Sequence, residues 1–299
     1  RRLVFAARGD LPAPGEPAAV REVVDHLVQV VGRQEADSAV VLGFGPPDRV
    51  TPVVDAAGPA LERAGLRVLD ALRVTDGRYW SYICADPDCC PPDGVPFDQV
   101  ASRFAAEATL AGQVALPDRA TLVRQVAPVD GPAREAMSRE TDRAVRRLSE
   151  LLEKAPPEDL LGGRTLRRAG ETAVAAAMRR YRSGGRLADD EAAWLTLLLT
   201  HLPVRDSAWE RTDGEQWHLD IWTDLLRRAE PDLVPAPASL LTFAAWRAGQ
   251  GALAAVALDR ALDAQPDYSM ALLLAELLAG GVPPSKMDGW PKIGPSDAG

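Results

Sequence analysis

Cysteine is scarce in this chain of 299 residues, and its three copies all lie between Cys84 and Cys90. An odd number of cysteines cannot form a complete disulfide framework, so we expect free thiols in a reducing compartment. Long apolar runs are also lacking. The longest stretches, such as residues 270–274, are far too short to span a bilayer, and no signal peptide is visible. The sequence therefore predicts a cytoplasmic protein with no membrane partner.

Positive charge is in deficit, because 34 lysines and arginines stand against 43 acidic residues and the formal net charge is -9. This balance favours solubility and argues against nucleic acid as a partner, since nucleic acid requires a basic face. One exception lies between Arg164 and Arg186, where there are seven arginines and one acidic residue, Glu171. Two interpretations of this stretch stay open: the solvated face of a helix, or a contact for phosphate or nucleic acid.

The first third of the chain alternates between strand and helix patterns. Continuous apolar runs and helical spacings alternate at residues 3–7, 16–31, 39–42, 48–64 and 66–74. Asp76 and Gly77 form a turn signal, which predicts a further strand at 78–83, hairpinned to the strand before it, and a helix follows at 99–111. This order predicts an α/β domain with a mostly parallel sheet and flanking helices. Because the chain begins at Arg1 with no methionine, inside or just before the first strand, we expect the numbering to begin within a longer protein.

After residue 133 the sequence shows only helical periodicity, which predicts an all-helical second domain. Helices are expected at residues 134–154, 163–181 and 187–202. Small and apolar residues between 239 and 280 fall at spacings that resemble one tetratricopeptide unit, which is a hairpin of two helices. These residues are Leu241, Ala244, Gly249, Ala254, Leu258, Ala261 and Pro266. A single unit does not make an extended peptide groove, but these helices are expected to offer a surface for a protein partner.

The patterns divide the chain into three parts. We expect an α/β domain at residues 1–128 that carries the cysteines, a helical domain at 129–282 that is partly tetratricopeptide-like, and a flexible tail at 283–299 that is rich in proline and glycine. Arg205 and Asp206 are neighbours in a turn of the helical domain. They are expected to form an ion pair with each other, with a cleft between the domains as the alternative location.

The stretch from Asp76 to Phe97 carries the residues with the richest chemistry, including every cysteine. Cys84, Cys89 and Cys90 have the spacing C-x4-C-C. A structural zinc site shows cysteines two to four residues apart together with a second pair elsewhere. Here the fourth ligand is missing nearby, and two adjacent cysteines rarely bind one metal ion together, so the sequence assigns no metal ligands. Candidates for a fourth ligand are Asp86, Asp88, His26, His201 and His218.

Other interpretations of the cysteines stay open. A redox role needs a thiol of low pKa and a resolving partner, and Cys84 can reach Cys89 or Cys90, although the chain has no C-x-x-C motif. A thiol nucleophile needs a histidine base, and none is close in the sequence. A purely structural interpretation is a self-packed turn, restricted by prolines such as Pro87 and Pro91, in which the thiols fill apolar gaps.

The strand before the cysteines has one face made of Arg78, Trp80 and Tyr82, because side chains alternate along a strand. Such a face suits an anionic or planar small molecule through cation–π contacts, stacking and forked hydrogen bonds. Core packing explains Trp80 and Tyr82 equally well, but Arg78 less easily. Arg8 and Asp10 follow another strand end, where ligands of such sheets usually bind. The expected ligand-binding residues are Arg8, Asp10, Arg78, Trp80, Tyr82, Cys84, Cys89 and Cys90, and neither a catalytic residue nor a cofactor is assigned.

The run GRYWSYICADPDCCPPDGVP at residues 77–96 resembles the signature of an actinobacterial family called domain of unknown function 4192. Further matches are ARGDLP at 7–12, LPVRDSAW at 202–209 and GALAAVALDRAL at 251–262. The resemblance covers nearly the whole chain, which lacks the upstream L-L-G-F-type segment of the family. The resemblance implies a fold and no reaction. Three functions stay open: a small-molecule-binding or enzymatic domain, a protein-interaction scaffold, and a metal- or thiol-dependent module at the cysteines.

Overall fold

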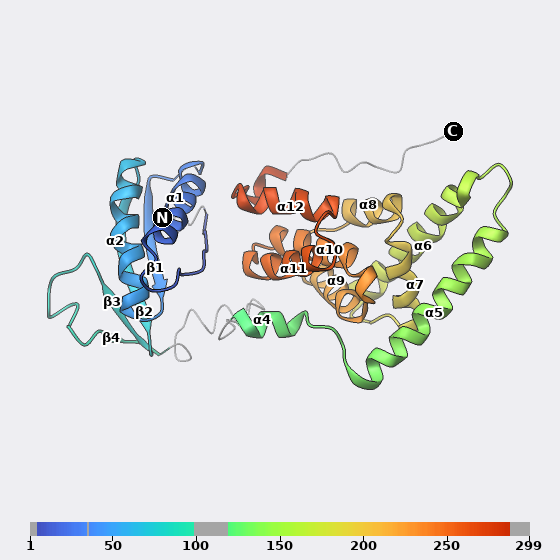
Figure 1. Ribbon diagram of the computed structural model, residues 1–299, viewed down its shortest axis with the longest axis horizontal. Helices are drawn as coiled ribbons and strands as arrows, with labels where there is room; N and C mark the ends of the chain where they lie inside the picture. The colour runs from blue at the N-terminus through green and yellow to red at the C-terminus, as the bar shows by residue number, and fades with distance from the viewer. Residues whose placement is uncertain (1–4, 35, 99–118, 288–299) are drawn as a thin grey trace. The chain divides into compact units, whose positions relative to one another are not determined.

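The computed structural model describes residues 5–34, 36–98 and 119–287 (Figure 1). The chain divides into two compact units, Arg1–Ala115 and Leu116–Gly299, and each unit is described by itself. The helix expected at residues 99–111, the start of the first expected strand, and the chain after residue 287 lie outside the described residues.

The first unit combines helices with a four-stranded sheet. Its described elements are α1 (Pro17–Gly32), β1 (Ser38–Phe44), α2 (Pro47–Arg63), β2 (Arg67–Thr75), β3 (Arg78–Ser81) and β4 (Val95–Pro96). The strands lie in the order β1-β2-β3-β4, with β1 parallel to β2 and the other two pairings antiparallel. The α/β character and the hairpin of β2 and β3 are confirmed. The mostly parallel character is not, because one of the three pairings is parallel.

The first expected strand is wrong for the part that the structure describes. Residues 5–13 have no regular secondary structure, and residues 6–10 are exposed. The two alanines of this run offer too little apolar surface to hold a strand in a sheet by burial. Arg49 holds the chain at Leu11 and Pro12. Its Nε donates a hydrogen bond to the carbonyl oxygen of Pro12 at 3.2 Å, and its Nη2 donates to the carbonyl oxygen of Leu11 at 2.5 Å.

Helix α2 is a middle layer between α1 and the sheet. On one side Val50 is fully buried in a cluster with Ala71 of β2, and on the other side Val53 packs in a cluster with Val24 of α1. Gly43 of β1 is required here, because a Cβ at that position would lie 2.3 Å from Cγ1 of Val50. Complete burial of a valine contributes about 2 kcal/mol. Packing on both sides of α2 therefore fixes the sheet that carries β3 and the cysteine loop.

The second unit is all helical over its described residues (Figure 1). Its elements are α4 (Arg119–Gln125), α5 (Gly131–Glu153), η1 (Leu160–Gly162), α6 (Gly163–Arg182), α7 (Asp189–Leu198), α8 (Leu202–Glu210), α9 (Gln216–Arg228), η2 (Pro231–Leu233), α10 (Pro235–Arg247), α11 (Gly251–Ala264), α12 (Ser269–Ala279) and η3 (Pro284–Met287). Residues 119–128 belong to this unit. Within them, the carbonyl oxygen of Val126 accepts a hydrogen bond from Arg260 of α11.

Helix α10 lies at the centre of the second unit, since every residue from Pro235 to Trp246 is buried. Helix α10 packs against α9 and forms a hairpin with α11. Helix α12 contacts both α10 and α11. The chain turns between α10 and α11 at Gly249, whose φ of +72° suits glycine. A helical hairpin is therefore present where the sequence predicted one. No helix in the described ranges has both the length and the apolar character needed to cross a membrane.

Buried charges join α6, α7 and α9. The carboxylate of Asp224 accepts hydrogen bonds from the hydroxyl of Tyr181 and from the guanidinium groups of Arg186 and Arg228. Arg228 also donates from Nη1 to Oδ1 of Asp189 at 3.1 Å. Burial, followed by the hydrogen bond to Asp224, raises the pKa of Tyr181 to about 12. Removal of one partner from such a network leaves a buried charge without compensation, so these residues fix how the three helices pack.

Ion pairs occupy most of the arginine-rich stretch between Arg164 and Arg186. Four of its seven arginines pair with carboxylates: Arg164 with Asp159, Arg167 with Glu171, Arg180 with Glu191, and Arg186 with Asp224. This arrangement favours the solvated, ion-paired helix face over a phosphate contact. The expected ion pair of Arg205 and Asp206 is confirmed, with Nη2 lying 2.6 Å from Oδ1.

Candidate metal centre

The cysteines lie in the long loop that joins β3 to β4 (Figure 1). The hairpin before this loop turns at Asp76 and Gly77, whose φ angles of 50° and 70° are both left-handed. A two-residue turn of this kind matches the twist of antiparallel strands and fixes their register. The register places Arg73 of β2 opposite Trp80 of β3. The start of the loop is therefore set by the sheet.

Arg78 and Trp80 hold the returning arm of the loop. Nη1 of Arg78 donates hydrogen bonds to the carbonyl oxygens of Asp93 at 3.1 Å and Gly94 at 2.8 Å. Nε1 of Trp80 donates to the carbonyl oxygen of Pro92 at 3.0 Å. The guanidinium carbon of Arg73 lies 3.6 Å from the centroid of the Trp80 ring. Two of the expected ligand-binding residues thus bind the backbone of their own loop.

The outgoing arm is tied to the sheet and to α2. Oγ of Ser81 accepts the backbone N–H of Cys84 at 3.0 Å and donates to Oδ1 of Asp70 at 2.8 Å. The hydroxyl of Tyr82 lies 2.8 Å from Oγ1 of Thr51 in α2, within hydrogen-bond distance. Tyr82, a further expected ligand-binding residue, therefore has a partner within the protein.

Asp86 organises the turn that carries the two adjacent cysteines. Its carbonyl oxygen accepts the backbone N–H of Cys89 at 3.2 Å and that of Cys90 at 2.7 Å. Its Oδ1 accepts the backbone N–H of Asp88 at 3.0 Å, which is the local hydrogen bond of an Asx turn. The turn folds the chain back on itself, so that Cys89 and Cys90 return to Cys84.

The three sulfur atoms form one cluster. The Sγ atoms of Cys84, Cys89 and Cys90 all lie within 4.8 Å of one another. Cys89 is exposed, the other two are half-buried, and all three are free of disulfide bonds. In a tetrahedral site with metal–sulfur bonds of about 2.3 Å, neighbouring sulfurs lie about 3.8 Å apart. Small side-chain rotations would therefore bring the three thiols onto one metal ion.

The thiols differ in acidity. The pKa of Cys84 is lowered, chiefly because the backbone N–H of Asp86 donates to its sulfur and also because the Cys90 thiol does. The pKa of Cys90 is raised to about 12, first by its hydrogen bond with Cys84 and then by partial burial. Between these two thiols, Cys84 therefore loses its proton more readily than Cys90.

The remaining candidates of the sequence do not join this cluster. Among the described residues, the group of side chains placed to hold a metal ion consists of the three cysteines alone, so neither Asp86 nor Asp88 belongs to it. The same holds for the histidines that the sequence offered as a fourth ligand. Arg8 and Asp10 are exposed on the irregular segment before α1. The sequence offered a metal- or thiol-dependent module at the three cysteines as one of three open functions. It did not show that the sulfurs converge, because that depends on the turn at Asp86.

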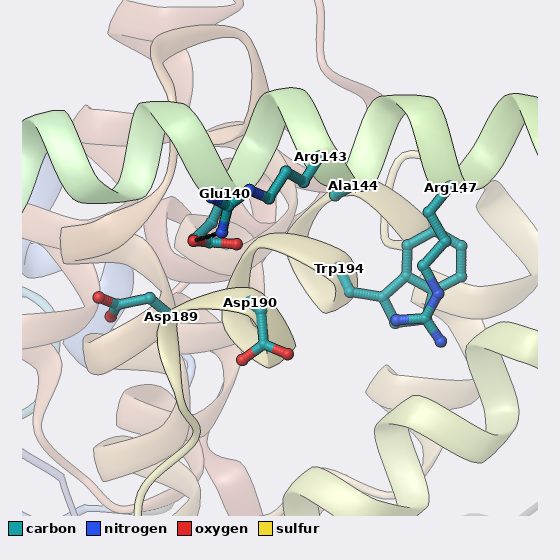
Figure 2. Close-up of a pocket in the computed structure, with 7 residues that line it drawn as sticks. All are labelled: Glu140, Arg143, Ala144, Arg147, Asp189, Asp190 and Trp194. Carbon is teal, nitrogen blue, oxygen red and sulfur yellow. Dashed lines mark hydrogen bonds and ion pairs between the residues drawn. The ribbon is translucent and has the colours of Figure 1, made fainter.

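A separate hollow of about 600 Å³ lies between α5 and α7 of the second unit (Figure 2). Its lining residues are Glu140, Arg143, Ala144, Arg147, Asp189, Asp190 and Trp194. Arg143 pairs with Glu140 at 2.6 Å, and the guanidinium carbon of Arg147 lies 4.1 Å from the ring centroid of Trp194. One ion pair and one cation–π contact thus lie in the wall of the hollow, whereas the thiol cluster brings three ligand atoms of one kind together.

Comparison with known proteins identifies the family and no activity. The model of the family described as Domain of unknown function (DUF4192) matches residues 1–285. No curated protein and no solved structure matches the chain significantly. The match includes the whole cysteine loop and both structural units up to η3. The chain belongs to the DUF4192 family.

Proposed function

We propose that the first unit binds a single thiophilic metal ion through Cys84, Cys89 and Cys90. The observation that carries this proposal is the convergence of three sulfur atoms within 4.8 Å of one another. Three free thiols at this separation, on a loop held by the protein's own hydrogen bonds, form a donor set that needs little rearrangement.

The donor type limits which ions fit. Thiolate sulfur is a soft ligand that selects zinc and monovalent copper, whereas magnesium, calcium and manganese prefer oxygen. No carboxylate or imidazole group is part of the cluster in the described chain. The proposed ligand is therefore an ion of the zinc or copper(I) class.

Elemental analysis of protein purified without chelator and under reducing conditions tests this function. The wild-type chain is expected to retain or take up one equivalent of zinc or copper, and C84S/C89S/C90S is expected to take up none. Asp88→Asn is the matched control, because Asp88 lies beside the cysteines in the same turn and is not proposed as a ligand. If the triple-serine variant binds as much metal as the wild type, the proposal is wrong.

A protein-interaction role for the second unit is a second candidate. We propose that the α10–α11 hairpin is tetratricopeptide-like, which is supported by complete burial of Ala244, Ala254 and Ala261 between close helices. Leu272 and Leu273 of α12 are 45% and 49% exposed, which supports a role in binding a protein partner. An experimental structure in which α12 does not stack on this hairpin would contradict the proposal.

The free thiols of the first unit also support a cytoplasmic location.

The small-molecule site expected from the sequence has less support than the metal site. It rests on Arg78, Trp80 and Tyr82, and these side chains bind the loop backbone and α2. An anionic or planar ligand would have to compete with these internal contacts. The same residues support the metal site in a different way, because they hold the loop on which the cysteines converge.

A further inference from the structure

We propose that the ion bound by the three cysteines is copper(I), held as an exchangeable cargo rather than as a structural support. This inference rests on the proposed function, since it requires that Cys84, Cys89 and Cys90 bind a metal at all. It adds the identity of the ion and the purpose of the site. Three features of the structure carry it: the number of donors, the independent support of the loop, and the exposure of one thiol.

The number of donors separates copper(I) from zinc. A structural zinc site has four protein ligands in a closed tetrahedron, and a zinc ion with three protein ligands keeps an open position for water. The group in the described chain has three sulfurs and no fourth protein ligand. Copper(I) is a soft ion that thiolates select, and three sulfurs complete a trigonal environment for it without water. The cluster therefore fits copper(I) better than zinc.

The loop does not depend on an ion for its fold. Structural metal sites supply folding free energy, and the segments that they organise unfold when the metal is removed. Here the returning arm is held by Arg78 and Trp80, which donate to the carbonyl oxygens of residues 92–94. The turn is held by Asp86, which accepts two backbone N–H groups and so sets the positions of the adjacent cysteines. The fold of the loop therefore does not require a bound ion.

One thiol faces solvent. Cys89 is exposed, whereas Cys84 and Cys90 are half-buried. An incoming thiol can therefore approach the ion from the side of Cys89. Its sulfur forms a new bond to copper as the bond from copper to Cys89 breaks, its proton passes to the departing Cys89 thiolate, and copper stays monovalent throughout. Such an exchange needs a second thiol compound and no oxidant or reductant.

Competition titration of the full chain under anaerobic conditions tests this inference. Copper(I) is titrated against the chromophoric chelator bicinchoninate, and zinc is titrated separately against a chromophoric zinc chelator. We expect a single copper(I) ion per chain, bound at least about a hundredfold more tightly than zinc. We expect C89S to weaken copper(I) binding at least tenfold and D88N to leave it unchanged.

Hydrogen exchange of residues 78–97 supplies a second readout. Because the loop is already ordered, exchange rates with and without copper(I) are expected to agree within about twofold. Strong slowing on metal binding would show that the ion is structural and would overturn the cargo role. Tighter binding of zinc than of copper(I) would overturn the identity of the ion and leave the metal site standing. Binding of neither ion above the level of C84S/C89S/C90S would overturn both proposals, and circular dichroism confirms that each variant is folded.

Discussion

Replacement of Gly94 by alanine measures how firmly the protein itself holds the cysteine loop. Gly94 has a φ of +76°, and an added Cβ would lie 2.4 Å from Cε2 and 2.8 Å from Nε1 of Trp80. The left-handed backbone costs an alanine about 1 kcal/mol. A displaced Trp80 ring would lose its hydrogen bond to Pro92, worth about 1 kcal/mol, and its cation–π contact with Arg73, worth a similar amount, about 1 kcal/mol. We therefore expect G94A to destabilise the loop by about 3 kcal/mol.

Hydrogen exchange of the full chain, followed by mass spectrometry, measures this loss in peptides that cover residues 78–97. A change of about 3 kcal/mol corresponds to roughly hundredfold faster exchange in the loop. Gly77→Ala is the matched control, because Gly77 has a similar φ of +70° and no atom lies within 4 Å of an added Cβ. Its expected cost is the backbone strain alone, about 1 kcal/mol. Equal effects of the two substitutions would refute the argument that the contact of Gly94 with Trp80 holds the loop.

Three further predictions concern the second unit, and urea unfolding measures each of them. Gly170→Ala should destabilise it by about 2 kcal/mol through overpacking, because a Cβ there would lie 2.1 Å from Cγ2 of the fully buried Val204; an unchanged midpoint would contradict this close contact. The pKa of Tyr181 is raised to about 12, so the phenol stabilises the fold fully below pH 10 and loses this effect as the pH rises towards 12. The difference in unfolding free energy between wild type and Y181F should shrink from pH 10 to about pH 12. A difference that stays constant would contradict the raised pKa of Tyr181. Hydrogen bonds led by the Thr165 hydroxyl lower the pKa of Asp159 to about 2, so the advantage of wild type over D159N should be present above pH 4 and vanish as the pH falls towards 2.

The elements with a clear buried face were predictable from the sequence. The apolar spacing of α1 and α2 reflects their burial against each other and the sheet, and the Asp76-Gly77 turn indicated the β2–β3 hairpin. The expected strand at residues 3–7 shows the limit of this reasoning. A short apolar run says nothing about whether a partner strand is available, and the described part of this run is irregular.

The candidate site was less predictable, because its geometry depends on backbone groups that carry no sequence signature. Spacing C-x4-C-C does not show that Cys89 and Cys90 return to Cys84, since this follows from the two hydrogen bonds that the Asp86 carbonyl accepts. The role of Arg78 was similarly hidden. Its side-chain chemistry indicated an anionic ligand, whereas its partners are carbonyl oxygens 15 and 16 residues further along the chain. Residue types in the sequence therefore indicated where the candidate site lies. The turn at Asp86 determines that the site consists of three converging sulfur atoms.

X-ray absorption spectroscopy of the copper(I)-loaded full chain tests whether the three cysteines bind one ion, because it counts the atoms bonded to the metal. We expect three sulfur neighbours at about 2.3 Å and no nitrogen or oxygen neighbour. Loss of one sulfur neighbour in C89S would follow from the same arrangement. A spectrum of the wild-type protein with nitrogen or oxygen ligands, or with fewer than three sulfurs, would contradict the claim that Cys84, Cys89 and Cys90 form one metal centre.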